Sequence, residues 1–462
     1  MEWSLQMTIQ TLVKMQRDYY NQGHTKTYEF REKALKQLYN SVVEHEDEIK
    51  EALYKDLNKS SGEAYLTEIG VTLKEIRFLK KHLKKLMKIK RVKSEITNFP
   101  AKNFISPSPY GVVLIMSPWN YPIFLTLAPL AGAIAAGNCV VIKPSNYSSH
   151  TQDIIEKMIL SVYENQFVAV VKGGREENQE LLNQKFDYIF FTGSTSVGKV
   201  VMEKAAKNLT PVSLELGGKS PTIVTEDAVI DLAAKRIAFG KLINVGQTCV
   251  APDYVLVHKK KQEELITKLK KYITQFYGEQ PLKNPDYGKI ISRKHFERLV
   301  SLFKGQEVAF GGEHDVEIEK IAPTILTNVD LESEVMQEEI FGPILPIIAY
   351  DNLEEAIEIV KSKPHPLALY LFTTSKKTIH QVLNSVQFGG GNINDCIMHV
   401  ASHHLPFGGV GESGMGSYHG KASFETFTHY RSLISKSNLY DLPIRYFPID
   451  KKKEDFIKKV LK

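Results

Sequence analysis

Three cysteines are the strongest nucleophiles in the sequence, and they stand far apart at positions 139, 249 and 396. A cysteine thiolate can attack a carbonyl carbon and leave a thioester that water opens. Cys139 lies in the apolar run CVVIK, whereas Cys249 ends the turn-like stretch NVGQTC. The odd number and wide spacing argue against a disulfide framework and indicate a reducing compartment. The residues alone leave Cys249 open to two interpretations, a catalytic nucleophile or a small buried side chain.

Three glycine-rich stretches could approach a phosphate closely. GSTSVGK at 193–199 has most of the P-loop spacing, but Val200 stands where a hydroxyl should hold Mg²⁺. An apolar strand precedes it and a helix follows, which predicts a pyrophosphate site without hydrolytic equipment. GGVGESG at 408–414 contains G-x-G-x-x-G but joins no strand to a helix, so we interpret it as a structural loop. ELGGKSP at 215–221 begins with a carboxylate and is a candidate for chemistry.

The elements that must position these residues alternate between strands and helices. Short runs that are apolar on both faces predict strands at GVVLIM, CVVIK, YIFFTGS and VSLELGG, with helical segments between them. This pattern indicates a doubly wound α/β fold with a parallel sheet, whose ligands bind at the carboxyl ends of the strands. Residues 103–142 contain no charged side chain, yet five prolines interrupt them, so we expect a buried strand–helix–strand unit rather than a membrane span.

Seven motifs together resemble one known family. They are SPWNYP, IKPSN, FFTGSTSVGK, LELGGKSP, NVGQTCVAPDY, EEIFGP and LPFGGVGESGMGSYHGKASFETFTH. Their order and spacing are similar to those of aldehyde dehydrogenases, in particular the short class 3 branch of fatty and aromatic aldehyde dehydrogenases, from about residue 30 to 435. The resemblance implies an NAD(P)-binding domain (1–90 and 110–216), a second α/β catalytic domain (217–415) and a small oligomerisation arm (91–109 and 416–435), before a basic tail (436–462).

The resemblance also implies a reaction and its residues. Cys249 matches the nucleophile, Glu215 the base that activates water, and Asn120 the oxyanion donor beside the Cys249 N–H. We therefore expect NAD(P)⁺-dependent oxidation of aldehydes, medium- or long-chain aliphatic or aromatic, to carboxylic acids through a thiohemiacetal and a thioester. A cofactor-independent cysteine esterase and a CoA-acylating dehydrogenase remain the alternatives; Glu215 favours water as the acyl acceptor.

The cofactor contacts that the resemblance implies fall at seven positions: Lys143, Asn146, Gly193, Ser194, Val197, Glu339 and Phe341. Asn146 departs from the family, which commonly has a glutamate there that binds the adenosine ribose. An amide does not repel a 2′-phosphate, and Lys143 adds a positive charge nearby. We therefore expect NAD as the cofactor, with NADP tolerated.

The net charge of +6 is concentrated in two segments. Residues 80–93 carry eight basic side chains and no acid, and the tail contains KKKEDFIKKVLK. We favour the interpretation that these segments are solvated surface, and the alternative hypothesis is weak contact with anionic lipid. No recognition motif supports nucleic-acid binding. His399, His403 and His404 lack a fitting fourth ligand, so no metal is expected. We expect a cytoplasmic homodimer without a signal peptide.

Overall fold

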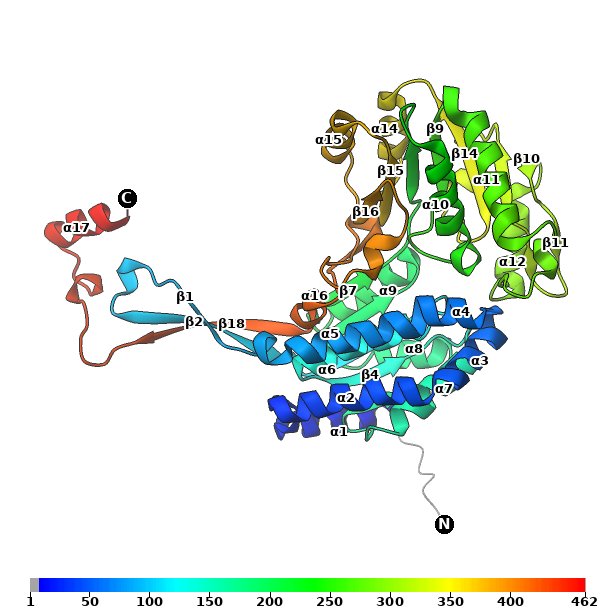
Figure 1. Ribbon diagram of the computed structural model, residues 1–462. Coiled ribbons are helices and arrows are strands. Elements are labelled where there is room, and N and C mark those ends of the chain that lie inside the picture. The colour runs from blue at the N-terminus through cyan, green and yellow to red at the C-terminus, as the bar shows by residue number, and fades with distance from the viewer. Residues whose placement is uncertain (1–7, 462) are drawn as a thin grey trace, which may run out of the picture.

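Two large sheets and a projecting three-stranded arm organise residues 8–461, the part of the chain that the computed structural model describes (Figure 1). A two-stranded hairpin, β11 (His314–Asp315) with β12 (Lys320–Ile321), lies beside them. The mixed α/β architecture with parallel sheets confirms the predicted fold class.

The first sheet has six strands in the order β17-β7-β6-β3-β4-β5. Their bounds are β3 Val112–Met116, β4 Cys139–Lys143, β5 Val168–Val170, β6 Tyr188–Thr192, β7 Val212–Glu215 and β17 Gly414–Met415. Strands β3 to β7 run parallel, and β17 is antiparallel to β7. Every residue of β3, β4 and β6 is buried, as both faces of a helix-covered parallel sheet require.

Helices cover this sheet and explain the long uncharged segment. They are α1 (Ile9–Asn21), α2 (Tyr28–Glu44), α3 (Glu46–Leu57), α5 (Gly70–Leu86), α6 (Phe124–Ala136), α7 (Ser149–Leu160), α8 (Arg175–Leu182), α9 (Thr195–Ala206) and α16 (Lys421–Thr426). Helix α6 is apolar all round because α2, α5 and α16 pack against it. It is the helix of the predicted buried strand–helix–strand unit. In residues 8–461 no helix combines the length and the hydropathy needed to cross a bilayer.

The second sheet has seven strands in the order β10-β13-β14-β9-β8-β15-β16. Their bounds are β8 Pro221–Val224, β9 Tyr254–His258, β10 Glu307–Phe310, β13 Thr324–Thr327, β14 Ile344–Tyr350, β15 Ala368–Phe372 and β16 Gly390–Ile393. All neighbours are parallel except β10 and β13. The accompanying helices are α10 (Ile230–Leu242), α11 (Gln262–Tyr277), α12 (Arg293–Phe303), α13 (Glu334–Gln337), α14 (Leu353–Lys361) and α15 (Lys376–Ser385).

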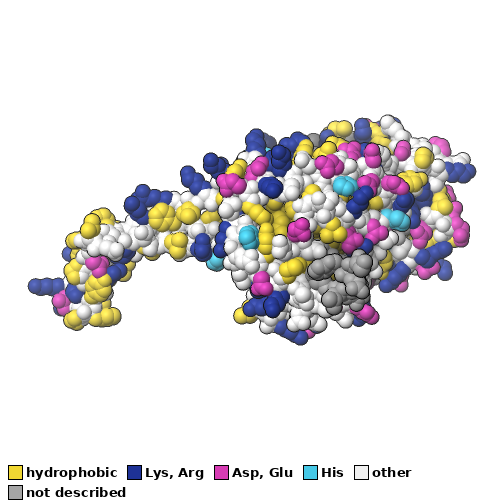
Figure 2. All heavy atoms as spheres, turned by 90° about the horizontal axis from the view of Figure 1, so that it is seen from below, with side chains coloured by type: hydrophobic (Ala, Val, Ile, Leu, Met, Phe, Trp, Pro, Cys, Tyr) yellow, Lys and Arg dark blue, Asp and Glu magenta, His cyan; other side chains and the backbone are white. Residues whose placement is uncertain are grey.

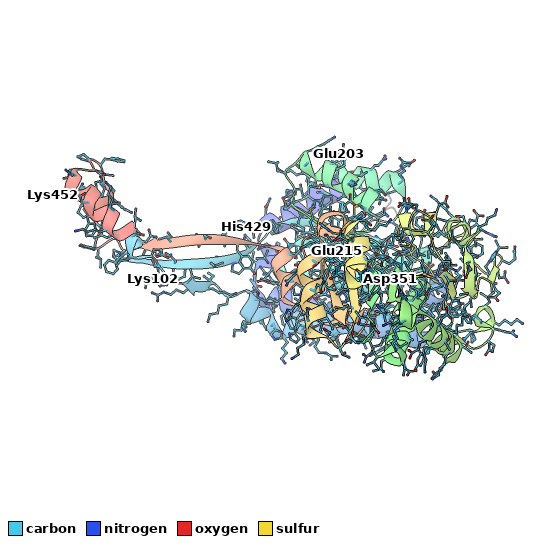
Figure 3. All side chains as sticks on the ribbon, turned by 90° about the horizontal axis from the view of Figure 1, so that it is seen from above. Lys102, Glu203, Glu215, Asp351, His429 and Lys452 are labelled. Atoms are coloured by element: carbon cyan, nitrogen blue, oxygen red, sulfur yellow. The ribbon has the colours of Figure 1, made fainter. Side chains whose placement is uncertain are left out.

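The arm consists of β1 (Lys90–Val92), β2 (Ala101–Pro109) and β18 (Thr428–Lys436), all antiparallel. It projects away from the two sheets and ends near helix α17 (Lys451–Leu461) (Figure 1). Lys102 and His429 lie along it, and Lys452 lies at its tip (Figure 3). Before β18, helix α16 packs on α6 of the first sheet's layer. The division of the chain into domains stays a prediction.

The strand order of the first sheet places its switch point between β3 and β6. The chain runs outward from β3 through β4 to β5, then returns to β6 on the other side of β3. Loops leaving adjacent strands at such a point diverge and open a crevice at their carboxyl ends. Asn120 follows β3 and Gly193 follows β6, so two of the predicted site residues share this edge.

Candidate active site

The stretch before Cys249 has an unusual backbone. Asn244, Val245 and Gly246 have φ values of 51°, 55° and 74°. A β-branched residue such as Val245 is strained in this left-handed region, and such strain persists only where surrounding contacts enforce it. Only glycine fits at position 246, because a Cβ there would collide with the carbonyl oxygen of Gly342.

Two amide side chains enforce this turn. Gln247, fully buried, donates from Nε2 to the carbonyl of Lys289 at 3.0 Å and accepts from the Ile291 N–H at 3.0 Å. Asn244 donates from Nδ2 to the carbonyls of Asn120 at 2.8 Å and of Gln247 at 3.1 Å. The loop that carries Cys249 is therefore fixed from both sides before the chain enters β9.

Cys249 faces a cavity of about 190 Å³ with a mainly apolar lining. The other lining residues are Leu66, Thr67, Val71, Tyr121, Phe124, Leu125, Phe239, Ile243, Thr248, Val250, Ile397, Met398, Val400, Ala401, Phe407, Tyr418 and His419. Burial raises the pKa of the thiol strongly, and the Glu339 and Glu215 carboxylates raise it further. The backbone N–H groups of Cys249 and Val250 oppose this shift. Cys139 and Cys396 are fully buried and lie outside this cavity.

Glu215 ends β7 near the middle of the molecule (Figure 3). The residue is 2% exposed, and neither carboxylate oxygen has a hydrogen-bond partner in residues 8–461. Burial raises the pKa of this carboxyl well above 4.5. A buried, unpartnered carboxyl group is costly, so it indicates a group kept for chemistry or for a ligand. Its carboxylate contributes to the raised pKa of Cys249, which stands 34 positions further along the chain.

Asn120 lies in the loop between β3 and α6 and is 3% exposed. Its Nδ2 donates one hydrogen to the carbonyl of Gln247 at 2.9 Å. A carboxamide nitrogen carries two hydrogens, so one remains for a second acceptor. This bond places the Asn120 amide beside the loop of Cys249, as an oxyanion donor requires.

Gly193 and Ser194 connect β6 to the 12-residue helix α9. Ser194 caps the helix, because its Oγ accepts from the Val197 N–H at 3.5 Å. A Cβ at Gly193 would lie 2.6 Å from the Phe191 ring, so only glycine allows the backbone to approach this ring so closely. The free N–H groups of the first turn and the helix dipole favour an anion. Val197 is 45% exposed on the same turn, which suits a flat apolar ring.

Lys143 is the last residue of β4, and Asn146 lies in the loop after it. Lys143 donates from Nζ to the carbonyls of Pro144 and Gly173, each at 2.8 Å, and burial lowers its pKa to about 8. Asn146 is exposed. Glu177 of α8 adds a carboxylate here that sequence reasoning missed: its Oε2 accepts from the Gly174 N–H at 2.6 Å, and its charge opposes the lowering of the Lys143 pKa. The G-x-x-E spacing of a helix start could have revealed it.

Glu339 and Phe341 lie in the loop between α13 and β14. Burial raises the pKa of Glu339 to about 8, and its Oε1 has no hydrogen-bond partner among the described residues. A Cβ at Gly217 would collide with the same carboxylate, so Gly217 leaves it room. Phe341, at φ 53°, packs edge-on against Trp119 with ring centroids 5.4 Å apart.

The Glu339 loop is held by a buried lysine and a half-buried arginine that the motifs did not identify as site residues. Lys219 pairs with Asp253 and donates to the carbonyls of Val335 and Glu338, each at 2.8 Å. Arg298 donates to the Ile340 carbonyl at 2.6 Å. The orphaned Glu339 oxygen, the open N-terminus of α9 and the glycine contacts together fit a dinucleotide that crosses the carboxyl edge of the first sheet.

The glycine-rich stretch at 408–414 lies next to Glu215 at the edge of the first sheet. Gly414 pairs with Glu215 in the antiparallel β17–β7 bridge, and a Cβ on Gly409 would collide with the Ser413 carbonyl. The stretch 408–414 thus joins no strand to a helix and closes the edge of the sheet next to Glu215, as the structural-loop interpretation predicts.

Comparison with known proteins places this geometry in a family. The sequence model described as "Aldehyde dehydrogenase family" matches residues 6–433. The 4,4'-diaponeurosporen-aldehyde dehydrogenase of Staphylococcus aureus (strain NCTC 8325 / PS 47) is 48% identical over 96% of this chain and 97% of its own. The "Aldehyde dehydrogenase, dimeric NADP-preferring" of Canis lupus familiaris is 46% identical over 95% and 98%. The solved substrate-bound state of Staphylococcus aureus AldH superposes with a TM-score of 0.97 at 47% identity, covering 98% of this chain and all of that one.

Proposed function

The chain belongs to the aldehyde dehydrogenase family and is an NAD(P)-dependent oxidoreductase acting on aldehydes, and we propose that Cys249, Glu215 and Asn120 carry its chemistry. The observation that supports this most is the orphaned, buried carboxyl of Glu215 close to the only cysteine that lines the cavity, within residues 8–461. The comparisons do not favour a cofactor-independent esterase or a CoA-acylating enzyme.

In the proposed reaction the Cys249 sulfur attacks the aldehyde carbon, and the thiol proton passes to Glu215. A carboxylate with a raised pKa is a suitable acceptor at neutral pH. The carbonyl oxygen becomes an oxyanion that accepts hydrogen bonds from Asn120 Nδ2 and the Cys249 N–H. NAD(P)⁺, which Gly193, Ser194 and Glu339 would hold, would supply the acceptor for the hydride that leaves the tetrahedral carbon, and Cys249 would retain the acyl group as a thioester.

Hydrolysis of the thioester uses the same carboxyl group. Glu215 releases its proton to solvent and then takes one from a water molecule, whose oxygen attacks the thioester carbon. The carbon–sulfur bond breaks, the carboxylic acid leaves, and the proton on Glu215 returns to the Cys249 sulfur, which restores both groups for the next turnover. Cys249→Ala should keep cofactor affinity and lose both aldehyde oxidation and hydrolysis of activated esters. Either activity at the wild-type rate in that variant would contradict the assignment.

The apolar cavity supports medium- or long-chain aliphatic or aromatic aldehydes as substrates. Leu66 and Met398, 58% and 50% exposed, extend its apolar lining toward solvent. The Staphylococcus aureus relative is named for 4,4'-diaponeurosporen-aldehyde. Burying one methylene contributes about 0.8 kcal/mol, so kcat/KM should rise about three- to fourfold per carbon until the cavity is filled. A panel of n-alkanals and aromatic aldehydes tests this; a flat profile would contradict it.

We further propose NAD as the cofactor with NADP accepted. Exposed Asn146 does not repel a 2′-phosphate, and the canine relative is named NADP-preferring. The Glu177 carboxylate beside Lys143 would repel a 2′-phosphate and therefore disfavours NADP⁺. Dissociation constants for both cofactors separate the contributions: Asn146→Glu should weaken NADP⁺ binding selectively, and Glu177→Gln should strengthen it. An NAD⁺ preference that neither substitution changes would contradict this proposal.

The exposed edge of the arm supports the proposal that the protein forms a homodimer. β18 is an edge strand of the arm, and Leu433 and Ile434 on it are 49% and 55% exposed. Exposed apolar edge strands are suited to pairing with another chain, and the canine relative is named dimeric. Sedimentation should therefore show a dimer for the wild type and a monomer for Ile434→Asp. A dimer that survives this change would place the interface elsewhere.

The residues at the tip of the arm support the proposal that the protein makes weak contact with anionic lipid in the cytoplasm. Hydrophobic and basic side chains lie together on it (Figure 2), and Phe456 and Leu461 of α17 are 53% and 71% exposed among lysines. Such a helix can bind anionic membranes reversibly. Co-sedimentation with anionic but not zwitterionic vesicles at low salt is expected, and its loss in Phe456→Ser. Absence of binding at low salt would contradict the lipid contact and mean that the tail is only a solvated surface.

A further inference from the structure

Lys59 and Glu68 form an ion pair that is removed from water. Their exposed fractions are 1% and 0%, and Lys59 Nζ lies 2.8 Å from Glu68 Oε1. Burying two charges costs free energy that the pair itself does not always return. The pair is therefore better explained by the groups that it holds than by stability alone.

Both members reach the segment that carries Asn120. Lys59 Nζ donates to the Asn120 carbonyl at 3.3 Å. Glu68 Oε2 accepts from the N–H groups of Ile123 and Phe124, each at 3.0 Å, at the start of α6. One ion pair thus fixes both ends of the five-residue segment from Asn120 to Phe124.

The local backbone aims Glu68 at this segment. Residues Tyr65–Ile69 form a π-helical turn between α4 (Ser61–Ala64) and α5. Such turns insert one residue into a helix, change the direction of the side chains that follow, and are frequent at functional sites. The Lys59 ammonium also lies 4.4 Å from the centre of the Tyr121 ring, and the Tyr121 hydroxyl bonds Thr248 Oγ1 at 2.5 Å.

A second carboxylate from the same region holds the other partner of Asn120. Glu63 Oε1 accepts from the Asn244 N–H at 2.5 Å, and Asn244 Nδ2 donates to the Asn120 carbonyl at 2.8 Å. The Asn120 carbonyl therefore receives donors from Lys59 on one side and from the Cys249 loop on the other. Its side chain, which donates to Gln247, has little freedom to move.

We propose that Lys59 and Glu68 are positioning residues for aldehyde oxidation, which fix the Asn120 carboxamide where the oxyanion forms. The inference rests on the proposed role of Asn120. Without the pair, the Asn120 segment keeps its sequence but loses three hydrogen bonds to charged groups, and the amide is displaced from its productive position. Displacements of about 1 Å at such a site cost on the order of a hundredfold in rate.

The test is a cycle of variants read out by the acylation rate. Single changes leave an unpaired buried charge and can prevent folding, so the pair is replaced together by apolar side chains of similar volume, as Lys59→Met with Glu68→Met. We expect acylation by a p-nitrophenyl ester without cofactor, and by an aldehyde with cofactor, to slow about ten- to a hundredfold. The ester concentration at half-saturation and the cofactor dissociation constant should stay unchanged. Asn120→Ala should slow acylation about 10²- to 10³-fold.

The combination of all three changes decides between positioning and a general structural effect. If the pair acts through Asn120, replacing it in the Asn120→Ala background should slow acylation less than twofold further. Fully multiplicative losses, or a pair variant with wild-type acylation, would overturn the inference while leaving the role of Asn120 intact. Wild-type acylation in Asn120→Ala alone would overturn the proposed oxyanion role and the inference with it.

A control ion pair, more exposed than Lys59–Glu68, lies at the amino end of β3 in the first sheet. Arg17 pairs with Asp187 at 2.6 Å, and Asp187 accepts from the Val112 N–H at the amino end of β3. Arg17→Met should lower the melting temperature without changing acylation. An equal loss of acylation in this control would mean that lost stability explains both variants, and would overturn the inference.

Discussion

The side chain of Asn120 donates to the main-chain carbonyl of Gln247 over 2.9 Å, although the two residues are 127 positions apart. Asn120 follows a strand of the first sheet, and Gln247 precedes Cys249 at the entrance to a strand of the second. One hydrogen bond thus connects the proposed oxyanion donor to the loop of the proposed nucleophile. The neighbouring Tyr121–Thr248 bond of 2.5 Å repeats this connection, so the relative position of the two sheets determines the geometry of the site.

Asn120→Asp tests the donor itself with almost no change of shape. The carboxylate cannot donate and would place a negative charge beside the developing oxyanion, so acylation should slow at least about 10²- to 10³-fold. Stopped-flow kinetics with an aldehyde and with an activated ester measure this, and cofactor titration provides the control, because cofactor affinity should not change. Acylation within a few fold of wild type would show that Asn120 only caps its loop.

Glu215→Gln tests the base. Without a carboxylate, neither the Cys249 thiol nor water can pass its proton to this residue, so acylation should slow, and the acyl-enzyme that forms should persist and be detectable by mass spectrometry of the intact protein. In the wild type, deacylation should fall as pH decreases through the raised pKa of Glu215, and therefore above pH 4.5, since only the ionised form is a base. The variant should lose this pH dependence. Steady turnover at the wild-type rate without acyl-enzyme would assign the base elsewhere.

The sequence predicted the elements of the first sheet because their signals are local. Runs such as GVVLIM and CVVIK are apolar on both faces, and the structure places them as the buried parallel strands β3 and β4. The helix of the uncharged segment was also predictable, since the prolines argue against a membrane span, and α6 accommodates Pro129 in its interior.

The network behind Asn120 could not be predicted, because its partners are distant and chemically ordinary in the sequence. Lys59 and Glu68 stand in a charged helical region where solvated side chains are the normal expectation, and only the fold shows that both are buried. The same holds for Lys219 with Asp253. Charge on a helix carries no periodic signal that separates a buried ion pair from a surface one.

Glu215 should also make folding stability depend on pH. Burial raises its pKa above the ordinary 4.5, so its contribution is fully present below that value and is lost as pH rises through the folded-state pKa. Glu215→Gln cannot ionise and should gain stability relative to wild type with rising pH, by up to about 1.4 kcal/mol per pH unit between the two pKa values. Thermal unfolding from pH 5 to 8 measures it. Exposed Glu51→Gln should show no such trend, and a trend absent from both would contradict the prediction.

Gly246 and Gly305 provide a pair for testing how the Cys249 loop is built. Their φ values are nearly equal, at 74° and 79°, so alanine meets a positive φ at both positions, which costs of order 1 kcal/mol. A Cβ at Gly305 would meet nothing within 4 Å, whereas a Cβ at Gly246 would collide with the Gly342 carbonyl beside the Glu339 loop.

Gly246→Ala should therefore lower the free energy of unfolding by at least about 2 kcal/mol more than Gly305→Ala, because overpacking is added to strain. It should also slow acylation, since the Gly246 backbone sets the direction of Cys249, while Gly305→Ala keeps the wild-type rate. Denaturant unfolding and ester-burst kinetics on both variants measure these effects. Equal stabilities and equal rates would mean that the loop adapts to the added methyl group and that its strained backbone does not position the nucleophile.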